Sequence, residues 1–175
     1  MSFSGTGKVW MNGKIVNWAD ANIHIATHII HYGSGVFEGA RCYKTPKGSA
    51  FFRLGAHMRR LYDSARIYRM DYDVDCETMT RGVIDTVIAN GLEACYIRPL
   101  IYRGYHTLGV NPLPCPVDTC ILVWEWGAYL GPGAGTGRRR ASQFVVARRT
   151  EHVSRDGQVG GQLCQLGLDQ DGSRR

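Results

Sequence analysis

The chain has 175 residues, of which 44% are hydrophobic and 21% charged, a composition typical of one soluble globular domain. It has no run of about 18 apolar residues, so we expect no transmembrane helix, and residues 1–8 form a flexible Gly/Ser-rich end without the apolar segment of a secretory signal. Most of the formal net charge of +6 lies in residues 135–175, which carry 8 Arg against 4 Asp and Glu.

The N-terminal part of the chain predicts two β-hairpins. Residues 8–18 contain two short apolar runs around Asn12-Gly13, which is the strongest short-range hairpin signal. Residues 36–43 alternate with the period of a strand. Residues 49–53 form its return strand across a turn at residues 45–48.

Two helices and two further strands follow the hairpins. Apolar residues at helical spacing predict helices over 56–70 and 76–89, and Asn90-Gly91 ends the second one. Residues 94–102 and 119–126 are predicted strands. Hairpins and two helices on a largely antiparallel sheet make an α+β fold.

The cysteines and histidines give little sign of a metal site. The six cysteines show no Cys-x-x-Cys spacing, and Cys42, Cys95 and Cys120 lie in apolar strand-like runs, where a reduced thiol behaves as a small hydrophobic group. This pattern favours a cytoplasmic protein over a disulfide framework or a zinc site. No carboxylate or cysteine stands near His28 and His31 to complete a metal site, so we expect structural histidines and no metal.

Two segments carry polar or glycine-rich patterns that are ambiguous when each is taken alone. The glycines of residues 33–39 permit close approach by a ligand or another backbone, but a tight turn entering a strand has the same pattern. The arginines of residues 57–65 fit either a solvated helix face or a phosphate site.

In their order along the chain, these segments resemble one family. HYGSGVFEGARCY, FFRLGAHMRRLYDSARIYRM, YIRPLIYRG, LGVNP and WEWGAYLG follow one another as they do in branched-chain amino acid aminotransferases, which are pyridoxal-phosphate enzymes of fold-type IV. The resemblance covers residues 9–133 and implies the small domain of that family. D-amino acid transaminases and aminodeoxychorismate lyases share the fold but are less similar to these segments.

The resemblance also implies an activity and a set of site residues. The family transfers an amino group between leucine, isoleucine or valine and 2-oxoglutarate as a homo-oligomer that carries pyridoxal 5′-phosphate, with no nucleic-acid or membrane partner. Arg60 matches the arginine that holds the cofactor phosphate. The positions that match the substrate site are Phe37 and Gly39 in its wall and floor, Tyr96 and Arg98 near the substrate carboxylate, Trp126 and Tyr129 in its lining, and Tyr32, Leu108 and Val110, which reach the neighbouring subunit's site.

The lysine that transamination requires is missing from the chain. That lysine holds the cofactor as a Schiff base and moves the proton between substrate and cofactor. The family places it just beyond this domain, whereas the four lysines here, Lys8, Lys14, Lys44 and Lys47, all lie in or beside predicted hairpins. We therefore expect a truncated and inactive fragment with no catalytic residue of its own.

The residues after the small domain predict a shift of reading frame. When the codons for residues 151–173 are read one nucleotide later, the permitted residues include NTFPAMAKSAANYVNSGLIKMEA, the segment that surrounds the lysine in the family. The lysine codon then straddles Gln158 and Val159, whose codons permit only Lys or Arg there. Residues 134–142 can likewise read LEQGVDVRV. We interpret residues 134–175 as an out-of-frame or disordered tail.

Other interpretations of the chain stay open. A lysine-less homologue could regulate an intact relative or dimerise with it, and another fold-type IV enzyme would have a similar sequence. A nucleic-acid module is disfavoured, because Phe144 is the single aromatic residue among the arginines of residues 138–149 and the segment has no recognisable binding fold.

Overall fold

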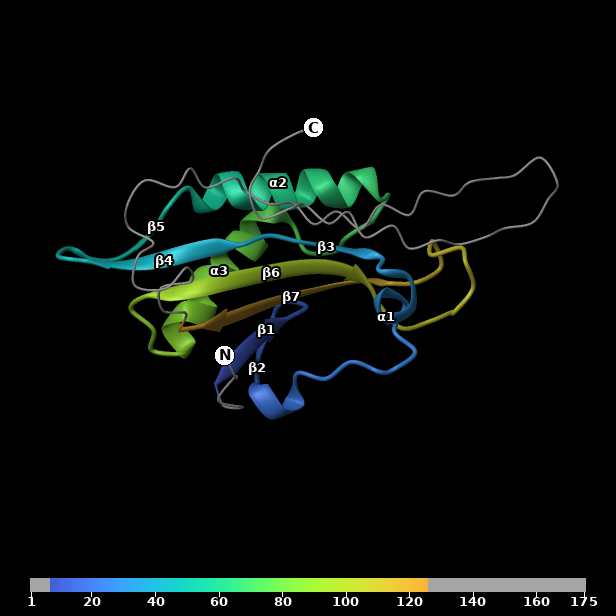
Figure 1. Ribbon diagram of the computed structural model, residues 1–175, viewed down its shortest axis with the longest axis horizontal. Helices are drawn as coiled ribbons and strands as arrows, with labels where there is room; N and C mark the ends of the chain where they lie inside the picture. Colours follow the sequence, from blue (N-terminus) through green and yellow to red (C-terminus); the bar gives the residue numbers. More distant parts are fainter. Residues whose placement is uncertain (1–6, 126–175) are drawn as a thin grey trace, which may run out of the picture. The chain divides into compact units, whose positions relative to one another are not determined.

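The computed structural model of the chain describes residues 7–125, which contain a seven-stranded antiparallel sheet and three α-helices (Figure 1). The strand order is β2-β1-β7-β6-β4-β5, and β3 pairs with β6. This arrangement confirms the expected α+β fold. The elements are β1 (Lys8–Met11), β2 (Lys14–Asn17), the 3-10 helix η1 (Trp18–Asp20), α1 (His28–Tyr32), β3 (Gly35–Phe37), β4 (Ala40–Thr45), β5 (Gly48–Phe51), α2 (Leu54–Ile67), α3 (Cys76–Ala89), β6 (Cys95–Arg103) and β7 (Val117–Trp124).

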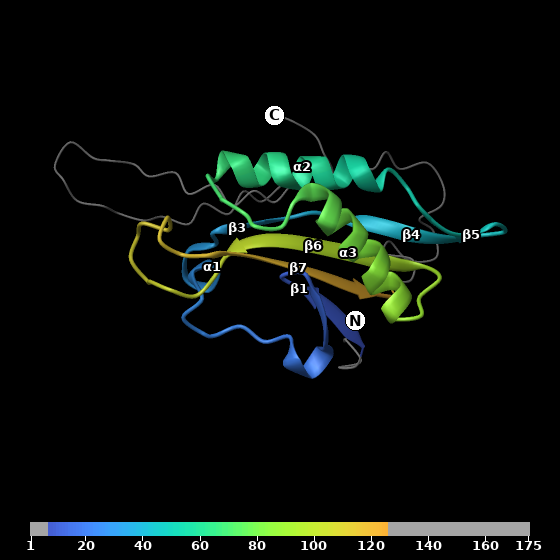
Figure 2. The same ribbon diagram turned by 180° about the vertical axis from the view of Figure 1, so that it is seen from behind.

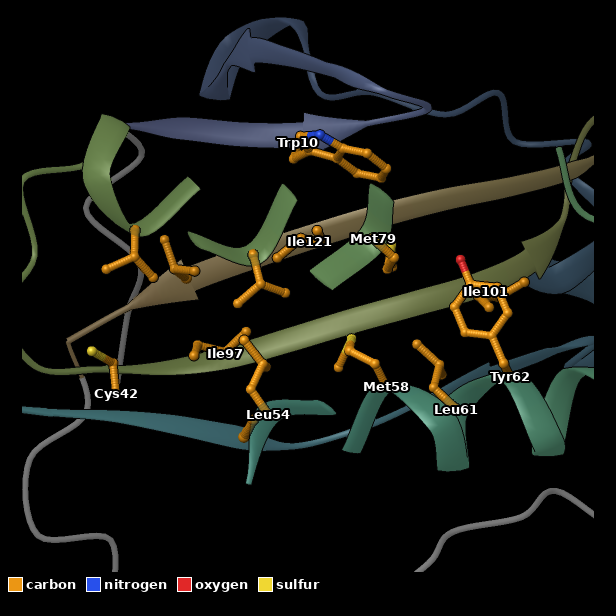
Figure 3. Close-up of a cluster of buried hydrophobic side chains, with 14 of the residues drawn as sticks. Trp10, Cys42, Leu54, Met58, Leu61, Tyr62, Met79, Ile97, Ile101 and Ile121 are labelled. Atoms are coloured by element: carbon orange, nitrogen blue, oxygen red, sulfur yellow. The ribbon is translucent and has the colours of Figure 1, made fainter. Parts of the chain in front are cut away.

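The hydrophobic core lies between the sheet and the two long helices. α2 and α3 contact each other and lie on the same side of the sheet (Figures 1 and 2). The buried side chains of this layer include Leu54, Met58 and Leu61 of α2, Met79 and Val83 of α3, and Ile97, Ile101 and Ile121 of the central strands (Figure 3). Burial of each such side chain stabilises the folded state by about 1.5–3 kcal/mol. This layer therefore holds the central strands of the sheet in place.

The first hairpin forms as the sequence predicts. β1 pairs with β2 from Lys8 opposite Asn17 to Met11 opposite Lys14. Asn12 and Gly13 have φ angles of 46° and 88°, the left-handed conformations that a two-residue hairpin turn requires.

The boundaries of α2 differ from the predicted residues 56–70. The helix begins at Leu54, directly after Arg53, which has a φ of 53°. It ends at Ile67, because Arg69 adopts a φ of 51° and Met70 donates its backbone N–H back to the Ala65 carbonyl. Periodicity alone does not reveal such left-handed residues, since neither position carries the usual glycine signal.

The boundaries of α3 agree with the predicted residues 76–89. Asp75 precedes the helix in an extended conformation, and its carboxylate accepts a hydrogen bond of 2.7 Å from the Thr78 backbone N–H. An Asp in this position satisfies one of the N–H groups that a helix start leaves unpaired, so the helix has a defined beginning.

The predicted strand over residues 36–43 is divided into β3 and β4. Phe37 is paired with Leu100 and Ala40 with Ile97, so the register against β6 is the same on both sides of the gap. Pro99 lies opposite Glu38 in that register. The Glu38 backbone N–H donates to the Pro99 carbonyl at 3.1 Å, but proline has no N–H to return. The ladder is therefore interrupted without a change of register.

The uninterrupted register assigns successive side chains to opposite faces of the sheet. On β6, Cys95, Ile97 and Ile101 belong to the core under the helices. Tyr96 and Arg98 alternate with them and point to the other face, which we call the far face. Glu38, between the core-facing Val36 and Ala40, points to the helix side.

The cysteines in the described part of the chain are free thiols. Cys42, Cys76, Cys95, Cys115 and Cys120 form no disulfide with one another. Burial is the main cause that raises the pKa of Cys95 and of Cys120 to about 12. Within residues 7–125, no helix has the length and apolar character needed to cross a membrane.

The packing of α3 against the sheet leads to a prediction for two helical glycines. A Cβ at Gly82 would lie 2.8 Å from the Trp10 ring and 3.1 Å from Ile121, whereas a Cβ at Gly55 would lie 3.7 Å from Arg59. We expect Gly82→Ala to lower the free energy of unfolding by about 1–3 kcal/mol through overpacking. Gly55→Ala should raise it by about 0.5–1 kcal/mol through helix propensity. Urea denaturation measures both, and equal effects of the two substitutions would contradict the packing described.

Candidate functional site

The far face carries four of the residues that the sequence singled out. Phe37, Gly39, Tyr96 and Arg98 come from β6 and from the strand that pairs with it. The constant register places Gly39 opposite Arg98, with Tyr96 two residues away along β6. The structure therefore brings together residues that are up to about 60 positions apart in the sequence, as expected for a site built by strand pairing.

Arg98 is surrounded by aromatic rings. Its guanidinium carbon lies 4.4 Å from the centre of the Phe37 ring, 5.3 Å from that of Tyr96 and 6.0 Å from that of Trp124. One of its terminal nitrogens donates to the Tyr96 hydroxyl at 3.2 Å. Its Nε is buried and has no hydrogen-bond partner within the described part of the chain. The arrangement holds a cation in a largely apolar setting, where it attracts an anion more strongly than in water.

Gly39 is required by the close approach of the Tyr96 side chain. A Cβ at this position would clash with the Tyr96 hydroxyl oxygen. The absent side chain thus leaves room for the hydroxyl that Arg98 contacts. Glycine commonly serves such close approaches within a strand.

On the helix side of the same strand, Glu38 binds Arg60 and His57 of α2. Arg60 donates from Nε to Oε1 and from Nη2 to Oε2 of Glu38, both at 2.6 Å. His57 Nδ1 lies 3.1 Å from Oε2 of the same carboxylate. The Glu38 side chain is 4% exposed, compared with 24% for His57 and 39% for Arg60. A bidentate contact of this kind is among the strongest hydrogen-bonded pairs in proteins.

The electrostatics of this cluster favour an ionised Glu38. Burial alone would raise the pKa of the Glu38 carboxyl, but the hydrogen bonds and positive charges of Arg60 and His57 outweigh that effect and lower it. The hydrogen bond to Glu38 likewise raises the pKa of Arg60. The pair is therefore ionised at neutral pH, and the charged Arg60 side chain stays partly exposed.

Tyr32, Leu108 and Val110 gather at another part of the described structure. The Tyr32 hydroxyl donates to the Leu108 carbonyl at 2.7 Å, and Leu108 and Val110 are 46% and 60% exposed. His28 stacks on Tyr32 and contacts Ser34 and the Gly109 carbonyl, so its ring is held by contacts within the fold. None of the three predicted residues has a contact with Arg98 or Arg60 among those found in residues 7–125.

Three of the predicted site positions lie outside the described residues. These are Trp126 and Tyr129, predicted to line the substrate pocket, and Gln158, where the shifted frame places the lysine. Within residues 7–125, no three His, Cys, Asp or Glu side chains are placed to hold a metal ion.

Sequence reasoning missed three residues of the site: Glu38, His57 and Trp124. A usable signal existed for Glu38, because it is a charged residue between two core-facing positions of a strand. His57 and Trp124 gave no such signal. Their contacts depend on the packing of α2 and on the pairing of Trp124 with Tyr96.

Comparisons with known proteins agree on one family. The class IV amino-transferase family matches residues 35–159. The branched-chain-amino-acid aminotransferase of Pseudomonas aeruginosa is 43% identical over 128 residues, which is 73% of this chain and 42% of that protein. The corresponding enzyme of Escherichia coli K12 is 44% identical over 127 residues, 72% of this chain and 41% of that protein.

Solved structures of such enzymes share the fold. The crystal structure of the Escherichia coli branched-chain amino acid aminotransferase has a TM-score of 0.70 at 43% identity and covers 73% of this chain and 42% of that one. The T.th. branched-chain enzyme, complexed with N-(5′-phosphopyridoxyl)-L-glutamate, has a TM-score of 0.68 at 45% identity, covering 71% of this chain and 42% of that one. The chain thus spans about two fifths of the length of the relatives it matches.

The lowered pKa of Glu38 predicts a pH-dependent contribution to stability. Because the folded state holds Glu38 ionised, its contribution is complete above the pKa of the unfolded carboxyl and is lost as the pH falls through the lower, folded value. At pH 7, Glu38→Gln should lower the free energy of unfolding by about 1–2 kcal/mol, the lower part of the range for charged hydrogen bonds because solvent reaches Arg60.

The matched control is Glu93→Gln, which removes an exposed ion pair with Lys44. Urea denaturation between about pH 7 and pH 3 should show that the effect of Glu38→Gln shrinks as the pH falls. The effect of Glu93→Gln should be small throughout. A Glu38→Gln penalty that stays constant down to pH 3 would mean that the carboxyl is not held ionised.

Proposed function

The chain belongs to the class IV aminotransferase family, and from that premise we propose that it is the N-terminal part of a branched-chain amino acid aminotransferase. The intact enzyme would transfer an amino group between leucine, isoleucine or valine and 2-oxoglutarate. The identities of 43–44% to branched-chain enzymes support this choice within the class. The observation that carries the proposal is the set of aromatic rings around Arg98.

Arg98 and its neighbours suit a substrate that is both anionic and apolar. The guanidinium, with a buried Nε that has no partner in residues 7–125, suits the carboxylate that amino acids and 2-oxo acids share. Phe37, 39% exposed beside it, offers an apolar surface for a branched aliphatic side chain. Gly39 leaves room for the Tyr96 hydroxyl, which contacts Arg98. These residues would bind and orient the substrate.

Arg60 is the residue that would hold the phosphate of pyridoxal 5′-phosphate. The Arg60 side chain is 39% exposed and carries a planar, permanently charged guanidinium, which suits an oxyanion that approaches from solvent. When bound, the cofactor supplies the electron-withdrawing ring on which the amino group is exchanged. The fit is partial, because the rest of the cofactor site would come from a part of the enzyme that lies beyond this domain.

A second copy of the chain fits the surface formed by Tyr32, Leu108 and Val110. The two aliphatic side chains are exposed, while the Tyr32–Leu108 hydrogen bond keeps the loop in place. Exposed apolar side chains on a well-ordered loop are typical of subunit contacts. We propose that this surface meets a neighbouring subunit, so that the intact enzyme is a homo-oligomer.

We further propose that the 175-residue chain is catalytically inactive because it lacks the required lysine. Lys8 and Lys14 lie in the first hairpin, and Lys44 and Lys47 lie in the β4–β5 hairpin. Lys44 is paired with Glu93 at 2.6 Å. None of the four lies on β6 or β3, the strands that carry Arg98 and Phe37. The shifted frame, which permits Lys or Arg at position 158, is consistent with a native protein that continues past residue 133 in another frame.

Inactivity of the chain as given is directly testable. The purified 175-residue chain should show no turnover of leucine with 2-oxoglutarate, because no lysine stands at the site. With pyridoxal phosphate it should show no Schiff-base absorbance beyond that of an unrelated protein with the same number of exposed lysines. The frame-restored protein, made by deleting one nucleotide or inserting two near codon 134, is the positive control. Turnover by the 175-residue chain would refute the assignment of the lysine to the lost segment.

In the frame-restored protein, two substitutions should separate cofactor binding from substrate binding. Arg60→Ala should weaken retention of pyridoxal phosphate by about 1.5–3 kcal/mol, since it removes a charge-assisted contact. Phe37→Ala should raise the KM for leucine and leave the cofactor bound. Dialysis followed by absorbance measures the first effect and steady-state kinetics the second. Loss of the cofactor in Phe37→Ala but not in Arg60→Ala would reverse the two roles.

A further inference from the structure

The buried carboxylate of Glu38 has no role in the proposed function, yet it contacts the guanidinium assigned to phosphate. Glu38 is only 4% exposed; its two oxygens accept from Arg60 Nε and Arg60 Nη2, and His57 Nδ1 lies 3.1 Å from Oε2. Full burial of a carboxylate is costly unless such partners compensate. Its occurrence next to a ligand-binding arginine therefore calls for a physical explanation.

By charge alone, Glu38 opposes anion binding. A carboxylate 2.6 Å from the Arg60 nitrogens cancels much of the positive potential that would attract a phosphate. If long-range attraction governed phosphate affinity, an uncharged residue at position 38 would give tighter binding than Glu38. An apolar neighbour would suit the surrounding strand equally well, since Val36 and Ala40 both pack against the core.

By geometry, Glu38 favours anion binding. An unrestrained arginine side chain has many rotamers, and a ligand that needs one of them must overcome the loss of the others. The bidentate contact fixes both the plane and the direction of the Arg60 guanidinium. The backbone of Glu38 is itself fixed through its hydrogen bond to Pro99. The position of the guanidinium is thus tied to the central strand of the sheet rather than to the helix surface alone.

We propose that Glu38 is a positioning residue for Arg60, which it holds in the orientation that binds the phosphoryl group of the cofactor. His57, three residues before Arg60 on α2, holds the second oxygen of the carboxylate and keeps it aligned. The inference rests on the proposed function, because it takes Arg60 as the phosphate ligand. It adds that the gain in phosphate affinity from a preoriented Arg60 is larger than the loss from repulsion between Glu38 and the phosphate.

The two physical effects predict opposite signs for one substitution. Glu38→Gln keeps the shape of the side chain and removes its charge. If charge governs the site, the variant binds a phosphate ester more tightly than the wild type. If Glu38 acts by positioning, the variant binds it more weakly, by about tenfold, the value of one charge-assisted hydrogen bond.

The experiment measures equilibrium binding of pyridoxamine 5′-phosphate to the full 175-residue chain by calorimetry, with pyridoxamine as the matched ligand without phosphate. This probe carries an amine in place of an aldehyde, so it forms no adduct with the four lysines. The affinity of each variant is compared with that of the wild type in buffer without urea, after circular dichroism has shown that the variant is folded. Glu93→Gln is the control for removing a carboxylate, and Arg59→Ala is the control for removing an α2 arginine.

The expected result has three parts. Wild-type chain, Glu93→Gln and Arg59→Ala bind the phosphate ester more tightly than pyridoxamine. Glu38→Gln loses about tenfold of that affinity, and Glu38→Asp, which restores the carboxylate, regains part of it. In wild type, the Arg60 Nε–H resonance is protected from solvent exchange, and in Glu38→Gln it is not. A residue with a purely structural role would change stability without this selective loss of phosphate affinity.

The outcomes separate this inference from the proposed function. If Arg60→Ala abolishes the preference for the phosphate ester while Glu38→Gln leaves it equal or stronger, positioning by Glu38 is overturned and Arg60 remains the phosphate ligand. Two results would overturn both the assignment of Arg60 to phosphate and the positioning role of Glu38. One is that Arg60→Ala binds both ligands as tightly as the wild type does; the other is that the wild type does not bind the phosphate ester more tightly than pyridoxamine. If Glu38→Gln does not fold, Glu38→Asp decides: unchanged phosphate affinity together with a lost Arg60 Nε–H protection overturns the inference.

Discussion

The pairing of residues 35–45 with β6 is the constraint on which the rest of the site depends. Phe37 pairs with Leu100 and Ala40 with Ile97, so one continuous register runs through the gap at Glu38 and Gly39. Pro99 removes a single ladder hydrogen bond and leaves the alternation of faces intact. A slip of one residue would move Glu38 to the far face and Gly39 into the core, and neither arginine would keep its partners.

This register places two arginines on opposite sides of one strand. Arg60 meets Glu38 on the helix side, whereas Arg98 lies opposite Gly39 on the far face and stacks on Phe37. Each guanidinium is held by a different means: a buried carboxylate for Arg60, and aromatic rings with a tyrosine hydroxyl for Arg98. Each of these two oriented guanidinium groups has the geometry to bind an oxyanion. The core beneath α2 and α3 keeps both in place.

The sequence predicted the elements that depend on local signals. Asn12-Gly13 predicted the first hairpin, and apolar spacing together with Asn90-Gly91 predicted the limits of α3. The ends of α2 were missed, because they depend on left-handed arginines that tertiary packing imposes. The same distinction holds for the site. Arg60 and Arg98 were predicted from family motifs, whereas the contacts of Glu38 and Trp124 depend on the strand register and could not be read from local sequence.

We propose that the native protein contains this small domain and that its catalytic lysine is encoded in the shifted frame. Sequencing the DNA across codons 130–175 tests it most directly. A lysine at the shifted position requires that the Gln158 codon be CAA, so that its last two bases and the first base of the Val159 codon read AAG. The account predicts this codon and an open shifted frame that encodes the family segment. A CAG codon at Gln158, which would give arginine, or an early stop in the shifted frame would contradict it.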